Sequence, residues 1–458
     1  MFAFRALRRV LQTKCCVNCG GGGYGRVFSS TFKDRFQLDY QLDRDYYLSP
    51  DNRDEILHNI RARKLAPLIK QLDQCNNDQE ITKFLEDNLV NLPVRLEDNW
   101  LDYDPEEKEN IDNYVLEEIN RLDGSKKTKK AVNLGRSHGL LYTSRYDNLG
   151  QVGISKSYFL FGDLARLHQA VIDWTLDILI DEHDFIPVSV PNLAYESVIK
   201  ACGYVSRGRA NQVFKLLGTN VENLDMNHQS QDKQNPVCLV GTAEIPLAAM
   251  HMGEVFQHED LPRKYCAVSR CYRAETGKTT EDSGIFRVPY FSKVEMFAFT
   301  AEDQSDYVLN EFVLLQKDLY SRLGFRFRLI DIPPPDLGTN AARKFDYEGW
   351  FPGPLRWGEI SSASNCKDYQ ARRLNLKYKS LNPDAKESNE PFVTNFVHTV
   401  NATACALPRV LSLILECGQD SGTIHIPVCL QPYMNGQETL QNVSDLFLTC
   451  SSNQQQQQ

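Results

Sequence analysis

The chain has 458 residues, of which 42% are hydrophobic and 24% are charged, and its formal net charge is −9 with a pI near 5.6. This length is enough for a large core with an appended module. The acidic balance gives no overall attraction to a phosphate backbone, so any contact with nucleic acid has to come from local basic patches. The sequence contains no apolar run of about 18 residues, which argues against a membrane span.

The first 33 residues carry several arginines and lysines but no Asp or Glu. Their apolar residues are spaced for a basic amphipathic helix, and Ser29, Ser30 and Thr31 follow. This pattern is typical of a mitochondrial presequence. We therefore predict that residues 1–33 are a presequence and that the protein works in the mitochondrial matrix.

Thirteen cysteines raise the question of disulfides or a zinc site. Three of them, Cys15, Cys16 and Cys19, belong to the expected presequence, and the others are scattered without a second close pair. This spacing does not favour a metal site with four cysteine ligands. Free thiols in a reducing compartment fit the pattern better.

Residues 34–130 are expected to form a small N-terminal helical module. Apolar residues recur at helical spacing in three stretches, Ile56–Leu72, Ile81–Leu89 and Ile111–Leu122, which predicts three helices. Prolines and an acidic loop interrupt them, so no seam is long enough for a two-helix coiled coil. The run Lys126–Lys130 predicts an exposed linker.

From about residue 155 the pattern changes. Helical spacing extends over Phe161–Glu182 and over an apolar segment, Leu407–Glu416, while Phe185–Pro191 is extended. Strands are expected at Lys264–Arg273, Ile285–Thr300, Phe325–Ile330, Trp357–Ile360 and Ala371–Tyr378. There is no regular alternation of strands and helices and no Gly-rich phosphate loop, so we predict an α+β fold, an antiparallel sheet flanked by helices, over residues 131–440. Residues 441–458 form a polar, low-complexity tail that need not fold.

The most informative stretch is Ser269–Glu275, followed after a polar loop by Phe286–Phe297. Both segments alternate apolar and polar residues, which predicts an antiparallel hairpin with one polar face. That face presents an arginine, two carboxylates and an aromatic ring, the groups that can hold a triphosphate, an ammonium and a flat base. Arg-x-Glu alone would fit a salt-bridged solvent face equally well. With the hairpin partner, we predict a nucleotide site.

Three segments resemble the motifs of class II aminoacyl-tRNA synthetases. They are the helix leading into Phe185–Pro191, the hairpin with Arg273-Ala-Glu275, and Asn401–Arg409 leading into the apolar helix. Gly241–Leu247, Glu359–Asn365 and Asp368–Arg373 resemble the seryl-tRNA synthetase family, and the pattern is closest to its animal mitochondrial form. The resemblance covers roughly residues 155–436, and several ordered motifs are far more specific than one.

The resemblance implies a dimeric ligase that uses ATP and Mg²⁺ to activate serine as seryl-adenylate and then charges mitochondrial tRNA-Ser. A homodimer is the default, with a heterodimer with a paralogous subunit as the alternative. By the same resemblance the catalytic residues are Arg273 and Arg409. The expected serine-binding residues are Thr242, Glu244, Arg273, Glu295, Asn401 and Thr403. The expected ATP-binding residues are Arg273, Glu275, Val288, Phe291, Glu359, Ser362 and Arg409, and Glu359 and Ser362 are the expected metal ligands.

Two departures from the family pattern keep other functions open. Val288-Pro289-Tyr290-Phe291 stands where the family shows Val-His-x-Phe, and the N-terminal module is too short and too acidic for the long coiled-coil arm that typically grips tRNA. The first hypothesis is the active ligase. The second is a synthetase-like subunit that has lost charging and acts as a binding or regulatory partner. The third is an enzyme that passes activated serine to another carrier.

Overall fold

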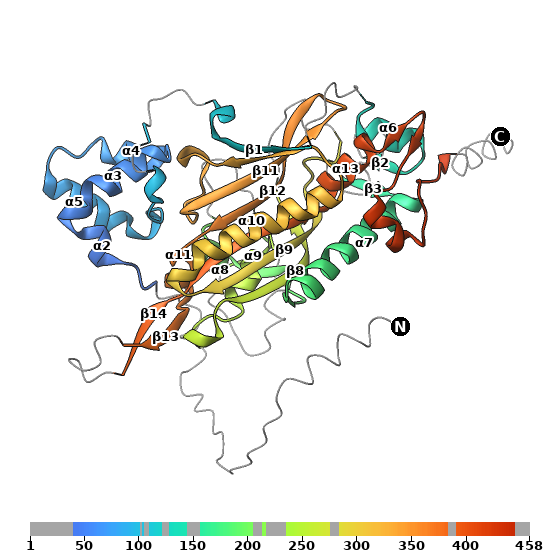
Figure 1. The fold of residues 1–458 in the computed structure, drawn as a ribbon. Helices are drawn as coiled ribbons and strands as arrows, with labels where there is room; N and C mark the ends of the chain where they lie inside the picture. The colour runs from blue at the N-terminus through green and yellow to red at the C-terminus, as the bar shows by residue number, and fades with distance from the viewer. Residues whose placement is uncertain are drawn as a thin grey trace, which may run out of the picture. The chain divides into compact units, whose positions relative to one another are not determined.

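An eight-stranded sheet is the centre of the computed structural model (Figure 1). The structure describes residues 40–100, 103–104, 110–120, 128–143, 156–204, 213–216, 235–274, 284–382 and 391–444. In spatial order the strands are β1 (Val115–Ile119), β10 (Phe327–Asp331), β11 (Arg343–Phe351), β12 (Arg356–Asn365), β15 (His398–Ala406), β9 (Tyr290–Thr300), β8 (Arg263–Tyr272) and β4 (Ile186–Pro187). β4 and β8 are parallel, and the other neighbours are antiparallel. The predicted antiparallel sheet is confirmed.

Three long helices pack their apolar side chains on this sheet. They are α7 (Gly162–Asp177), which continues as a π-helical turn (Ile178–Glu182), α10 (Ser305–Arg322) and α13 (Leu407–Cys417). Their buried residues form one apolar cluster with inward-facing residues of β9, β11 and β15, such as Val294, Tyr347 and Ala402. Burial of this cluster is the main driving force for the fold. The predicted helices at Phe161–Glu182 and Leu407–Glu416 are confirmed.

Alternation along β9 separates this core from the opposite face of the sheet. Val294 and Met296 belong to the core cluster, whereas Lys293 and Glu295 line a cleft on the other face. The period of two that a strand imposes therefore places charged side chains next to fully buried apolar ones. The expected antiparallel β8–β9 hairpin is confirmed, and its register places Cys271 opposite Phe291.

The N-terminal residues form short helices, α2 (Arg44–Leu48), α3 (Arg53–Ala62), α4 (Ala66–Leu72) and α5 (Asp78–Asn88), around an apolar cluster of their own. The expected helix at Ile81–Leu89 is confirmed as α5, and the stretch Ile56–Leu72 is helical but divided into α3 and α4. Pro67 occupies the first turn of α4, where proline is tolerated. The third expected helix, Ile111–Leu122, is wrong. It forms a 3₁₀ turn (Ile111–Tyr114) and then β1, because this short segment with β-branched residues at both ends pairs with the edge of β10.

The strand expected over Ala371–Tyr378 is also partly wrong. Residues Tyr369–Leu374 form α11, which ends at Asn375 in the left-handed conformation with φ 53°, and the strand β13 begins only at Lys377. A left-handed Asn is a common way to end a helix, and it reverses the chain before the strand. β13 (Lys377–Leu381) pairs with β14 (Phe392–Phe396) and β7 (Val255–Gln257) in a separate three-stranded sheet.

Shorter elements complete the described part of the chain. The helices are α6 (Ala131–Ser137), α8 (Glu196–Ala201) and α9 (Glu244–Ala249). The 3₁₀ turns are Pro50–Asn52, Leu89–Asn91, Asp98–Trp100, His258–Asp260, Glu302–Gln304, Pro334–Asp336 and Val428–Met434. The small strands are β2 (Leu141–Thr143), β3 (Tyr158–Leu160), β5 (Leu193–Tyr195), β6 (Val237–Leu239), β16 (Gln419–Asp420) and β17 (Thr423–Ile424).

The linker and the tail are described only in part. Lys129 and Lys130 are exposed, as the sequence predicts for the linker, and Lys126 and Lys127 lie outside the described residues, as does the whole presequence. At the beginning of the tail, Gln441 donates its backbone N–H to Asp163 (2.9 Å), and residues 445–458 lie outside the description. The cysteines of the described part are free thiols, and within it no helix is long and apolar enough to cross a membrane.

Candidate active site

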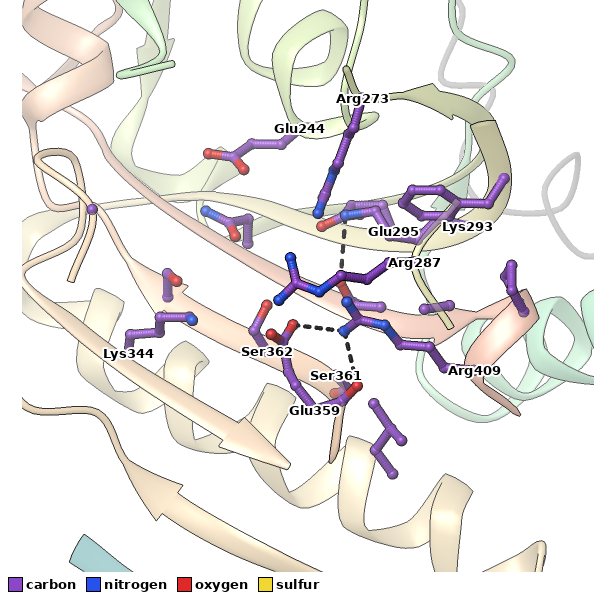
Figure 2. Close-up of a pocket in the computed structure, with 18 of the residues that line it drawn as sticks. Glu244, Arg273, Arg287, Lys293, Glu295, Lys344, Glu359, Ser361, Ser362 and Arg409 are labelled. Atoms are coloured by element: carbon purple, nitrogen blue, oxygen red, sulfur yellow. Dashed lines mark hydrogen bonds and ion pairs between the residues drawn. The ribbon is translucent and has the colours of Figure 1, made fainter. Parts of the chain in front are cut away.

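A cleft of about 1020 Å³, partly open to solvent, lies over β9, β12 and β15 (Figure 2). Ten of the residues predicted for the site line it, namely Glu244, Arg273, Val288, Phe291, Glu295, Glu359, Ser362, Asn401, Thr403 and Arg409. Thr242 lies directly behind the wall and donates a hydrogen bond to Glu295 (3.3 Å). Glu275 lies outside the described residues.

The β8–β9 hairpin positions Arg273. The residue follows the last residue of β8, and its backbone N–H donates to the carbonyl of Pro289 (2.8 Å). Its guanidinium carbon lies 5.3 Å from the centre of the Phe291 ring, a cation–π contact. Because β9 begins at Tyr290, Pro289 stands just before the strand, where its missing N–H breaks no rung of the ladder.

The first end of the cleft, which we call the acidic end, consists of Thr242, Glu244, Lys293, Glu295 and Thr403. Lys293 forms an ion pair with Glu295 and donates to the hydroxyls of Thr242 (2.9 Å) and Thr403 (3.4 Å). Thr403 faces Glu295 across the β9–β15 ladder. The acidic end thus holds two carboxylates for one ammonium group, a balance that favours a ligand with a further positive charge.

Glu244 is the first residue of α9 and is fully enclosed. It accepts hydrogen bonds from the hydroxyl of Tyr204 and from the side-chain amide of Gln370 (2.6 Å). Burial, together with the charge of Glu295, raises the pKa of Glu244 to about 7, although the hydrogen bonds and Lys293 oppose the rise. Burial also raises the pKa of Glu295, against the pull of Lys293. A cation that enters here would favour the ionised form of Glu244.

The second end of the cleft, the cationic end, contains Arg287, Lys344, Glu359 and Arg409 (Figure 2). Arg409 comes from the first turn of α13, where the helix dipole disfavours a positive charge. Its guanidinium donates to the backbone carbonyl of Glu359 (2.8 Å), lies 3.1 Å from that residue's carboxylate, and sits 4.8 Å from the centre of the Phe286 ring. The positive charges of Arg287, Lys344 and Arg409 could therefore compensate further anionic groups of a ligand at this end.

Glu359 is ionised in this environment. Burial alone would raise its pKa, but Arg409, Lys344 and Arg273 outweigh this effect and lower the pKa to about 2. The side chain is still 42% exposed, because it faces the solvent of the cleft. Lys344 also pairs with Asp346 (2.8 Å), whose pKa burial raises to about 7. A charged, reachable carboxylate beside a serine hydroxyl, Ser362, can act as a ligand for a cation.

The gap between β12 and β15 opens the floor of the cleft. Only Ala363–Asn365 of β12 pair with Val400–Ala402 of β15. Next to these paired residues, each strand has an irregularity in its register with its other neighbour. From α10, the side-chain amide of Gln316 donates to the carbonyls of Ser362 (2.9 Å) and Thr403 (2.8 Å). These bonds satisfy backbone groups that the divergence would leave unpaired, so Ser362 and Thr403 can face the cleft at little energetic cost.

Other cleft residues carry weaker sequence signals or none. Lys293 belongs to the alternating face of β9, and the structure adds its contacts. Arg287 follows Phe286 in the predicted hairpin segment but was not assigned a role there. Tyr204 and Asn340 come from loops without a periodic pattern, so only the folded chain brings them to the wall. Lys344 lies on β11, a strand that the sequence analysis did not predict.

Comparisons with known proteins identify the family. The model for the tRNA synthetase class II core domain (G, H, P, S and T) matches residues 225–417. Mouse mitochondrial Serine--tRNA ligase is 39% identical over 293 residues, 63% of this chain and 52% of the mouse protein, so the match spans about half of that relative. Serine--tRNA ligase of Treponema denticola is 34% identical over 393 residues, 84% of each chain.

Solved structures agree with this result. The cytoplasmic Serine-tRNA ligase of Naegleria fowleri, in complex with AMP, has a TM-score of 0.66 at 28% identity and covers 83% of this chain and 76% of its own. The seryl-tRNA synthetase of Pyrococcus horikoshii, complexed with ATP, has a TM-score of 0.64 at 28% identity and covers 86% and 89%. The resemblance expected from the motifs is confirmed. The chain belongs to the serine--tRNA ligase family and has the class II synthetase fold.

Proposed function

We propose that this protein activates serine with ATP to form seryl-adenylate and then charges mitochondrial tRNA-Ser in the matrix. One observation carries the proposal: a single cleft has an acidic and a cationic end, and Arg273 acts electrostatically on both, on Glu295 and on Glu359. The ammonium group of an amino acid suits the acidic end, and the phosphates of a nucleoside triphosphate suit the cationic end. Relatives crystallised with AMP and ATP, and mitochondrial relatives in mouse, cow and yeast, support it.

In the activation step a carboxylate oxygen of serine attacks the α-phosphorus of ATP, and the bond from that phosphorus to the bridging oxygen of pyrophosphate breaks. The nucleophile is already ionised, so the reaction needs no general base. The protein contributes position and charge neutralisation. Arg273 suits this task, since its planar guanidinium can hold the carboxylate and an α-phosphate oxygen together, which a lysine cannot do.

The acidic end is the proposed serine pocket. Glu244 and Thr242 would hold the ammonium, Glu295 with Thr403 would hold the hydroxyl, and Asn401 would complete the polar lining of the pocket. Alanine would leave the buried partners of the hydroxyl unpaired, and threonine would exceed the space between them. Discrimination therefore depends on polar partners, not on apolar contact area.

The cationic end is the proposed triphosphate site. Phe291 would stack on adenine, with Val288 beside it and Glu275 at the base edge, and Arg409 and Arg287 would neutralise the terminal phosphates. The donor set fits Mg²⁺ only as a shared site, because one carboxylate, Glu359, and one hydroxyl, Ser362, need phosphate oxygens to complete the coordination. When bound, the ion would neutralise charge on the phosphates.

The N-terminal residues bear on how tRNA is bound and are compatible with two functions. The helices α2 to α5 are 5 to 11 residues long, so the described part of the module contains no long two-helix arm. A binding or regulatory subunit that has lost charging would have this feature. A dimer in which the partner contributes to the grip on tRNA would keep the ligase activity and have the same feature.

Serine-dependent exchange of pyrophosphate into ATP tests the activation step. We expect exchange with serine but not with alanine or threonine, and Arg273→Lys should reduce it by about 10²–10³-fold, as the loss of a transition-state contact does. Arg263→Lys, at the other end of β8 where the side chain pairs with Asp260 (3.5 Å), is the matched control and should leave exchange unchanged.

The outcomes separate the hypotheses. Lack of serine-dependent exchange by the folded wild-type protein would exclude the ligase hypothesis and leave the hypothesis of a binding subunit. Exchange without charging of mitochondrial tRNA-Ser transcripts would favour another carrier of the seryl group. Equal exchange by wild type and Arg273→Lys would show that the role of Arg273 is misassigned.

A further inference from the structure

Among the residues that the structure describes, Arg63 is the largest fully buried side chain, with 1% of its surface exposed, and it lies outside the cleft. It follows the last residue of α3, in the N-terminal module. Its guanidinium donates to the side chain of Asn59 (2.6 Å) and to the backbone carbonyls of Val94 (3.0 Å), Gly338 (2.6 Å) and Ala341 (2.9 Å). One side chain therefore joins the N-terminal helices to a segment nearly 280 residues further along the chain.

The segment that Arg63 holds is a wall of the cleft. Within residues 336–342, Asp336, Gly338, Asn340 and Ala341 line it. The same segment is tied to the module once more, because the backbone N–H of Val94 donates to the carbonyl of Thr339 (2.9 Å). The N-terminal module thus holds this segment in addition to the turn bond from Ala341 to Gly338 and the bond from Ala342 to Asn365 of β12.

Asn340 links this wall segment to the acidic end of the cleft. Its side-chain amide donates to the carbonyl of Cys202 (3.2 Å), and the same carbonyl accepts from Gln370 (3.3 Å), which also binds Glu244. Asn340 packs closely on Gly203: a Cβ built at this glycine, where φ is +90°, would lie 2.6 Å from Cβ of Asn340. Any larger residue at 203 would clash.

Tyr204 belongs to the segment that Asn340 contacts, Cys202–Tyr204. The hydroxyl of Tyr204 donates to the second carboxylate oxygen of Glu244. Both oxygens of Glu244 are therefore oriented by groups that contact the Cys202–Tyr204 segment. A displacement of residues 336–342 would move this segment and turn the carboxylate.

We propose that Arg63 is a positioning residue for the acidic end of the cleft, and that through it the N-terminal helices take part in binding the amino acid. The inference rests on the proposed function, since the acidic end is the proposed serine pocket. Only a planar group with several donors can satisfy carbonyls that approach from different segments, so lysine is a poor replacement. At the cationic end, Glu359 comes from β12, Arg409 from α13 and Arg287 from the hairpin segment, and the carbonyls that Arg63 binds belong to none of these elements; Lys344 lies on β11, which begins just after the wall.

The test compares Arg63→Lys with Arg95→Lys in pyrophosphate exchange. Arg95 belongs to the same module, but its side chain is 50% exposed and pairs with Glu55 (2.8 Å). Arg63→Lys should raise KM for serine by roughly tenfold or more, as a small misplacement of a binding group does, while KM for ATP stays within about twofold. Arg95→Lys should leave both constants unchanged.

A double-mutant cycle identifies the route. Asn340→Ala should raise KM for serine by itself, and the double variant should show less than the product of the two single effects, because both act through one segment. Equal changes in both KM values, or a fall in kcat alone, would mean a general structural role and would overturn the proposal. Independent effects of Arg63 and Asn340 would overturn the route.

Hydrogen exchange provides a readout that does not need catalysis. The backbone N–H groups of Ala341 and Ala342 donate to Gly338 (3.2 Å) and Asn365 (2.8 Å), so their protection reports on the wall. These two N–H groups should exchange faster in Arg63→Lys than in wild type. Unchanged protection would overturn the inference, and this result does not depend on whether the wild type is active. If Arg63→Lys does not fold, Asn59→Ala removes one contact of the guanidinium and should produce a smaller change of the same kind.

Discussion

Glu244 and Glu359 are two carboxylates of one cleft with opposite pKa shifts. Burial raises the pKa of Glu244 to about 7, whereas burial at Glu359 is outweighed by Arg409, Lys344 and Arg273, which lower the pKa to about 2. The same residue type therefore serves two purposes, since environment decides the charge. Near neutral pH, Glu359 is fully ionised, and Glu244 is divided between its two forms.

This difference predicts a selective pH dependence. An ammonium ligand needs the ionised form of Glu244, so KM for serine should fall as the pH rises through about 7, by roughly tenfold between about one unit below and one unit above the pKa. KM for ATP should change less over this range, because Glu359 stays ionised and the group that titrates near 7 at the cationic end, Asp346, is paired with Lys344. Steady-state exchange at several pH values measures both constants.

Glu244→Gln is the control for this prediction. The variant has no titrating group at this position, so its KM for serine should be higher and should lose the pH dependence. Glu295 also faces Glu244 and pairs with Lys293, and Glu295→Gln should shift the midpoint to lower pH by removing a like charge. A pH profile of Glu244→Gln identical to that of wild type would assign the titration to another group.

At the level of elements, α10 supports the floor of the cleft. Gln316 is fully buried and reaches the carbonyls of Ser362 and Thr403, while the hydroxyl of Tyr320 reaches the carbonyl of Ala404 (3.0 Å). The helix thus provides hydrogen bonds where β12 and β15 part. Without such partners the strands would close on each other or leave buried acceptors unpaired.

Gln316→Leu should therefore reduce both stability and activity. Leucine leaves two buried carbonyls without a partner, which costs about 1–3 kcal/mol for each group in the free energy of unfolding. Asn310→Ala, an exposed position on the same helix, should change it by less than about 0.5 kcal/mol. Chemical denaturation measures the difference, and a neutral Gln316→Leu would mean that water satisfies these carbonyls.

The sequence pattern predicted the elements that depend on local periodicity and missed those that depend on distant pairing. The stripes at Ile56–Leu72 and Ile81–Leu89 became helices, whereas Val115–Ile119, within the third stripe, joined the sheet because β10 offers an unpaired edge. β15 is buried on both faces, so it has no alternation to read. For the site, alternation placed Lys293 and Glu295 on one face, but no local pattern could bring the loop residues Tyr204 and Asn340 to the wall.

At the level of the whole molecule, the N-terminal helices and the catalytic sheet share buried surface. An apolar cluster joins Ala62, Leu96, Trp100 and Tyr103 to Ile330, Ile332, Leu337 and Ala341. Together with Arg63 it makes the two regions one cooperative unit. We expect them to unfold in a single transition.

Trp100→Ala tests this expectation. Trp100 is 7% exposed, so its truncation should cost about 3–5 kcal/mol and lower the melting temperature of the entire described unit. Leu116→Ala, on β1 where the side chain is 58% exposed, should have little effect. Calorimetry distinguishes the outcomes, because an early, separate transition in Trp100→Ala would show that the helices melt independently.

The short turn of residues 73–77 between α4 and α5 has a practical consequence for chimeras. Most of its residues are exposed, and it belongs to neither the Arg63 contacts nor the shared apolar cluster. Exposed turns of this kind accept insertions. A hairpin grafted here from a longer relative could add reach toward a nucleic acid without disturbing residues 59–63 or 92–96, whereas replacing the module outright would also remove the Arg63 contacts to the wall of the cleft.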